Sequence, residues 1–76
     1  MKELLKSELR SKIVLKSSLM EMWEILKNYK DRGMSKDDAY NILQELRAEF
    51  DEEGEDRILE LMDYVIGFCA PSMRLY

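Results

Sequence analysis

Apolar residues recur at helical spacing through the middle of this chain, and this pattern restricts the fold more than any other feature of the sequence. Steps of 4, 7 and 11 residues from the first member place all of them on one face of an α-helix, with polar residues opposite. We therefore predict an amphipathic helix over residues 36–52 that buries this face against other helices. The members of the stripe are Ala39, Leu43, Leu46 and Phe50, with Ile42 beside them.

The segment before this helix predicts the end of one helix and the start of the next. Lys30 and Arg32 lie where cations are favoured, near the negative end of a helix dipole. Gly33 suits the left-handed residue that closes a helix. Ser35, with Asp38 three residues later, forms a capping-box pattern for a new helix. The chain therefore changes direction at this point.

The N-terminal third contains two apolar faces. Leu5, Leu9 and Ile13 share one face of an ideal helix. A second set shares another face, rotated by about 120° when each residue turns the helix by about 100°. One long helix would have to bury both faces. The second set consists of Leu15, Leu19, Met22, Leu26 and Tyr29.

A break in this third would remove the conflict between the two faces. Ser18 and Glu21 form a second capping-box pattern, so a fresh helix can begin there. The sequence leaves both arrangements open. We favour a break near residues 11–18, with helices over residues 2–10 and 18–32.

The last predicted helix, over residues 55–69, is apolar around most of its circumference. We expect Gly54 to terminate the helix before it, and Pro71 to leave residues 71–76 as a short tail. A helix this apolar lies at the centre of a bundle or is covered by a partner. Its apolar residues are Ile58, Leu59, Leu61, Met62, Val65, Ile66, Phe68 and Cys69.

These patterns predict an all-α fold, a small bundle of three to four helices in a single domain over residues 1–76. The chain has no histidine and one cysteine, so it cannot close an internal disulfide or build a Cys/His zinc site. Histidine is also the commonest general base. We therefore predict no catalytic, metal or cofactor site and do not expect an enzyme, and we interpret Cys69 as a buried structural thiol.

Charge is unevenly distributed along the chain. Residues 1–36 hold nine Lys/Arg and five Asp/Glu, a net charge of +4, whereas residues 37–76 hold three and eleven, a net charge of −8. The acidic half predicts a surface for a basic partner, although a solvated corner between helices would have the same composition. Trp23 is either an interface anchor or the edge of the core. The candidate partner-binding residues are Glu45, Glu49, Asp51, Glu52, Glu53, Glu55, Asp56 and Trp23.

Targeting signals are not evident in the sequence. Lysines and arginines interrupt the first 30 residues, so no apolar run there is long enough for a secretory signal. No stretch approaches the roughly 20 apolar residues that a membrane span needs. A free thiol is typical of a reducing compartment. We therefore expect a soluble cytoplasmic protein with neither membrane nor nucleic acid as its partner.

Two segments resemble small helical bacterial immunity proteins, including those of contact-dependent growth inhibition systems. The first is Gly33-Met34-Ser35-Lys36-Asp37-Asp38-Ala39, followed by an acidic amphipathic helix, and the second is the closing run from Asp63 to Tyr76. Proteins of that kind bind a cognate toxin and block its active site. The resemblance implies a toxin as the partner, and a nuclease toxin would offer a basic groove.

The function predicted from these observations is a protein-binding inhibitor, an immunity protein against a nuclease-type toxin. The first alternative is a structural or adaptor subunit that forms a homodimer through its C-terminal helix. The second is a small nucleic-acid-binding regulator such as an antitoxin. The acidic surface distinguishes the inhibitor from both alternatives, because neither alternative depends on it.

Overall fold

Four α-helices account for most of residues 2–67 and 71–76, the parts of the chain that the computed structural model describes. They are α1 (Lys2–Val14), α2 (Leu19–Asp31), α3 (Lys36–Arg47) and α4 (Glu52–Ile66), and a short 3-10 helix, η1 (Pro71–Met73), follows. Within these residues there is no strand, so the predicted all-α fold is confirmed.

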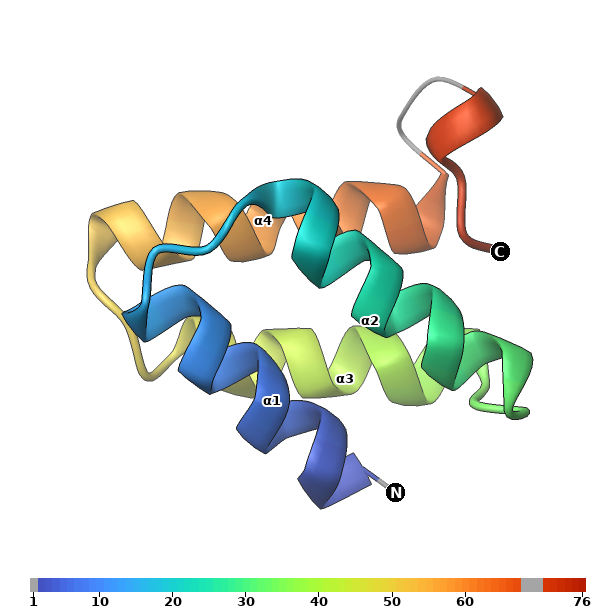
Figure 1. The fold of residues 1–76 in the computed structure, drawn as a ribbon, viewed down its shortest axis with the longest axis horizontal. Coiled ribbons are helices and arrows are strands. Elements are labelled where there is room, and N and C mark those ends of the chain that lie inside the picture. The colour runs from blue at the N-terminus through green and yellow to red at the C-terminus, as the bar shows by residue number, and fades with distance from the viewer. Residues whose placement is uncertain (1, 68–70) are drawn as a thin grey trace.

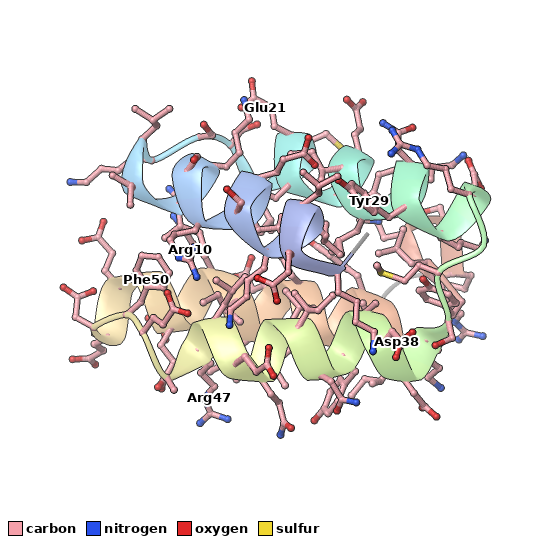
Figure 2. All side chains as sticks on the ribbon, turned by 90° about the horizontal axis from the view of Figure 1, so that it is seen from below. Arg10, Glu21, Tyr29, Asp38, Arg47 and Phe50 are labelled. Carbon is pink, nitrogen blue, oxygen red and sulfur yellow. The ribbon has the colours of Figure 1, made fainter. Side chains whose placement is uncertain are left out.

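The helices form two layers around one core. Figure 1 shows α3 and α4 running side by side with α1 and α2 lying across them, and Figure 2 shows the α1–α2 layer above the α3–α4 layer. Contacts join α3 to α4, α1 to α3, α1 to α2 and α2 to α4, so each helix packs on two neighbours. Side chains from every helix meet between the layers. The most deeply buried are Leu5, Leu9, Met22, Leu26, Leu43, Leu46, Ile58, Leu61, Val65 and Leu75.

The break in the N-terminal third is confirmed, but α1 is longer than predicted. It continues from the predicted end at residue 10 to Val14, because Ile13 still points into the core and is 6% exposed. The chain then turns through Lys16, which has a positive φ of 57°. The Ser18 Oγ accepts a hydrogen bond of 3.3 Å from the Glu21 backbone N–H and caps α2.

The junction between α2 and α3 follows the predicted pattern. α2 ends within one residue of the expected position, and Gly33 adopts the left-handed conformation with φ of 106°. The Ser35 Oγ accepts a hydrogen bond of 3.1 Å from the Asp38 backbone N–H, as a capping residue does. Met34, between the two signals, is buried.

The predicted boundary between the last two helices is wrong by several residues. α3 ends at Arg47 and not at residue 52, and Gly54 does not terminate it. Gly54 lies in the first turn of α4 and is buried, and its N–H donates 3.3 Å to the capping Asp51 carboxylate. The acidic residues that follow Asp51 begin a helix because the positive end of its dipole favours them. α4 therefore begins at Glu52, not at residue 55.

Gly54 is required by close packing and not by backbone conformation. A Cβ at this position would lie 2.7 Å from the Phe50 Cβ, which is closer than two non-bonded carbon atoms can approach without one of them shifting. Because helical glycine costs up to about 1 kcal/mol relative to alanine, Gly54→Ala would ordinarily stabilise a helix. Here we expect it to lower the free energy of unfolding by about 1 kcal/mol, since overpacking outweighs the gain. Urea denaturation measures the sign directly, and a variant more stable than the wild type would contradict this packing.

α4 packs on α2 and α3 through its apolar face. The sequence left open whether the apolar face of this helix lies in the core of the bundle or is covered by a partner. In the structure Ile58, Leu61 and Val65 are fully buried against the other helices, so this face lies in the core. Gly67, with φ of 93°, caps the helix after Ile66. The predicted extension to residue 69 and the assignment of Cys69 as a buried thiol lie outside the described residues, as does Phe68.

Residues 71–76, which the sequence predicted only as a short tail, pack on the bundle. Leu75 is 2% exposed, and its backbone N–H donates 3.0 Å to the Tyr64 carbonyl of α4. The Tyr76 hydroxyl donates 2.9 Å to the Met34 carbonyl. The segment after η1 therefore folds back and closes one end of the core.

Candidate protein-binding surface

Three of the seven candidate carboxylates form ion pairs within the chain. Glu45 and Glu49 of α3 pair with Lys6 and Arg10 of α1, respectively, at 3.4 Å and 2.8 Å. Glu55 pairs across the α3–α4 turn with the Arg47 side chain at 3.4 Å. The basic N-terminal part and the acidic C-terminal part of the chain are thus joined by ion pairs within one molecule.

The Arg10–Glu49 pair has the geometry of a bidentate interaction. The Arg10 Nε donates to one Glu49 oxygen at 2.8 Å and a terminal nitrogen donates to the other at 3.0 Å. These hydrogen bonds lower the pKa of the Glu49 carboxyl below its usual range, and Lys6 adds to the effect. The pairing with Arg10 and Lys6 therefore favours the charged form of the Glu49 carboxylate.

The other four candidate carboxylates gather where α4 begins. Asp51 caps the helix, and Glu52, Glu53 and Asp56 are exposed to solvent. Two further exposed carboxylates, Glu60 and Asp63, continue the same side of α4 toward its C-terminal end. We call Glu52, Glu53, Asp56, Glu60 and Asp63 the α4 acidic face. Its members form no ion pair with any residue that the structure describes.

Glu60 and Asp63 are functional candidates that the sequence analysis missed. They follow Asp56 by four and seven residues, which is the spacing of one helical face. With them, the α4 acidic face extends over three turns, about 16 Å at about 1.5 Å per residue.

An apolar hollow of about 240 Å³ opens beside the start of this face. Ile13, Val14 and Phe50 contribute its apolar lining, and Glu53 borders it. Arg57 borders it too, and its guanidinium donates a hydrogen bond to the Ser17 carbonyl, tying α4 to the turn after α1. Figure 2 shows Phe50 and Arg10 on the same side of the molecule. A partner side chain that enters the hollow would thus lie next to the acidic face.

Trp23 is bonded to the C-terminal segment of the chain. Its side chain is half-buried against the core, and its indole N–H donates 2.7 Å to the Met73 carbonyl. A tryptophan whose single donor is already bonded within the chain acts as a structural clamp. In the structure Trp23 therefore lies at the edge of the core.

Two tyrosine hydroxyls have shifted pKa values. Burial raises the pKa of the Tyr29 and Tyr76 hydroxyls, with Glu8 adding to the effect at Tyr29, so both stay protonated at neutral pH.

Within residues 2–67 and 71–76, no three Cys, Asp or Glu side chains are arranged to hold a metal ion. In the same residues, no helix is both long and apolar enough to cross a membrane. What the surface offers chemically is charge and apolar contact, which are means of binding.

Comparison of the chain with protein-family models, with curated proteins and with solved structures found no match.

Proposed function

We propose that this chain is a protein-binding inhibitor that contacts a basic partner through the α4 acidic face. The observation that carries the proposal is a row of five exposed carboxylates without ion-pair partners among the described residues, beside an apolar hollow. Exposed like charges at helical spacing repel one another, and a cationic partner would relieve that repulsion. The hollow would supply the apolar anchor that binding energy needs in addition to charge.

The partner class that fits this surface is an enzyme whose substrate is itself an anion. Such an enzyme, a nuclease for example, lines its groove with cations, and an acidic helix placed over that groove would exclude the substrate. The resemblance to helical immunity proteins supports a toxin as this enzyme. In this proposal the α4 acidic face steers association, and the hollow at Val14 and Phe50 limits dissociation.

The two alternatives have less support from the arrangement of the helices. An adaptor that dimerises through α4 would need an exposed apolar face, and Ile58, Leu61 and Val65 are fully buried. A nucleic-acid-binding regulator would need a continuous basic surface, and the exposed side of α4 carries carboxylates that repel phosphate.

The test begins by identifying what contacts α4. A photo-crosslinking amino acid at position 56 captures the contacting molecule in the cells that produce the chain, and the captured protein is then purified. We expect a basic protein whose nuclease activity falls when one equivalent of the chain is added. A captured nucleic acid, or a protein whose activity is unchanged, would contradict the proposal.

The second measurement isolates the contribution of charge. Glu53→Gln, Asp56→Asn and Glu60→Gln in one variant should lower the association rate constant by on the order of tenfold at low salt, because steering by these charges is lost. The difference should shrink near 0.15 M salt, where the screening length is about 8 Å. Surface plasmon resonance at several salt concentrations measures both effects.

A matched control removes the same amount of charge elsewhere. Glu3, Glu21 and Glu24 are exposed carboxylates of α1 and α2, and their triple replacement by glutamine changes the net charge equally. We expect this control to associate within about twofold of the wild type, because its charges lie far from the contact. Equal losses in both triple variants would mean that net charge, and not the α4 acidic face, governs association.

A further inference from the structure

Residues 71–76 are held on the bundle in the way that a bound peptide is held. Beyond η1 the segment has no regular structure of its own, and Figure 1 shows it returning alongside the end of α4. The Trp23 indole N–H donates 2.7 Å to the Met73 carbonyl. The Leu75 backbone N–H donates 3.0 Å to the Tyr64 carbonyl. α2 and α4 thus bind main-chain groups at alternate positions of the segment, which is how extended peptides are held.

Two side chains of the segment add specificity to these main-chain contacts. Leu75 is 2% exposed and is part of the core, so its side chain occupies an apolar site in the bundle. The Tyr76 hydroxyl donates 2.9 Å to the Met34 carbonyl. The Lys30 ammonium lies 5.8 Å from the centre of the Tyr76 ring, within the range of a cation–π contact. The bundle therefore offers an apolar site followed by a site for an aromatic hydroxyl.

Most of the core is independent of this segment. Fifteen of the sixteen buried apolar residues that the structure describes lie between Leu5 and Val65, and within residues 71–76 only Leu75 is buried. Regions with few buried contacts open at a lower free energy than the whole structure. Residues 71–76 can therefore detach while the four helices stay packed, and their detachment uncovers the sites that they occupy.

We propose that the surface around Trp23, Met34 and Tyr64 is a peptide-binding groove, and that the chain's own residues 73–76 are its internal ligand. The groove takes an extended segment in which leucine is followed by tyrosine, and the same segment supplied on another molecule competes for it. Residues 71–76, which we call the strap, keep the groove closed. No carboxylate of the α4 acidic face takes part in these contacts, so the inference is independent of the proposed function.

The closed groove sets an upper limit on the dissociation constant of a free peptide. A ligand on a short tether has an effective concentration in the millimolar range, and the closed state predominates only where this concentration exceeds the dissociation constant. A free peptide with the sequence of residues 71–76 should therefore bind an open groove with a dissociation constant below about 1 mM. In the wild-type chain the strap competes, and binding should be at least about tenfold weaker.

Leu75→Ala provides the open groove in the whole chain. The peptide Pro-Ser-Met-Arg-Leu-Tyr, capped at both ends, is titrated into this variant, and Trp23, the only tryptophan, reports occupancy. We expect its emission to move to shorter wavelength and the Tm of the variant to rise as the peptide takes the place of the strap. No binding to the variant up to about 5 mM peptide, or equally tight binding to the wild type, would overturn the proposal.

The matched control is a peptide with alanine at the position of Leu75. We expect it to bind the variant at least about tenfold more weakly than the native peptide, because the apolar site of the groove is left partly empty. A control peptide that binds as tightly as the native one would mean that the leucine is not recognised, and the assignment of the groove would be wrong.

Hydrogen exchange in the wild-type chain measures whether the strap opens by itself. The Leu75 N–H should exchange at least about tenfold faster than the N–H of Leu43, a buried residue of α3, because release of the strap exposes only the first. Equal protection of the two would mean that strap and bundle open together, which contradicts the proposal. A Leu75→Ala chain without helical circular dichroism would also contradict it, because the groove would not exist apart from its ligand.

Discussion

Leu9→Ala should lower the free energy of unfolding by about 3 kcal/mol, the range measured for large-to-small changes in well-packed cores. Leu9 is fully buried where α1 meets the other layer, so its removal leaves a cavity as well as a loss of apolar burial. A chain of this size has a total stability of on the order of 5–10 kcal/mol. Thermal denaturation followed by circular dichroism should therefore show a fall in Tm of roughly 15 °C.

The same helix supplies the control for this prediction. Leu4→Ala makes the identical chemical change one face away, where the side chain is 64% exposed. Helix propensity changes equally in both variants, so their difference isolates burial. We expect Leu4→Ala to lie within about 0.5 kcal/mol of the wild type at low protein concentration. Equal losses in the two variants would mean that α1 is not packed by Leu9.

Leu75→Ala should lower the free energy of unfolding by about 2–3 kcal/mol and release residues 71–76 from the bundle. The side chain is 2% exposed, and its backbone N–H bonds to Tyr64. Trp23 is the only tryptophan, and its indole N–H bonds to the Met73 carbonyl, so it reports the release directly. We expect its fluorescence to shift to longer wavelength as water reaches the ring.

Tyr76→Phe separates packing from hydrogen bonding at the same place. It removes the bond from the hydroxyl to the Met34 carbonyl and keeps the ring, so we expect a loss of about 1 kcal/mol with little change in fluorescence. If Leu75→Ala left both the Tm and the Trp23 emission unchanged, residues 71–76 would not form part of the core in solution.

The sequence predicted the existence of the helices better than their boundaries. Helical spacing identified the helical segments but left open whether the first third held one helix or two, and the serine caps at Ser18 and Ser35 placed two starts to within a residue. The boundary at Gly54 was wrong because glycine has two common uses near a helix. It can end a helix through a positive φ, or it can admit a neighbouring side chain, and only the position of the Phe50 ring distinguishes them.

The candidate surface was predictable in part. Sequence analysis found the acidic half of the chain, but composition could not divide its carboxylates into paired and unpaired ones. That division depends on Lys6 and Arg10 arriving from 39 residues away. Glu60 and Asp63, in contrast, follow from the helical spacing of the sequence alone. The burial of Leu75 was not predictable, because no periodic pattern surrounds it and the bundle itself creates its site.

The distance in sequence between the residues of the α1–α3 ion pairs also bears on how the chain folds. α3 and α4 are joined by four residues, so their contact closes a short loop, whereas docking α1 on α3 closes one of 39 residues. The entropy lost in closing a loop grows with its length and is lost before the long-range contact contributes stability. The helical hairpin of α3 and α4 is therefore an expected nucleus, and the contact of α1 with α3 is the one expected to form late and open early, even though α1 is joined to α2 by a connection of the same four-residue length.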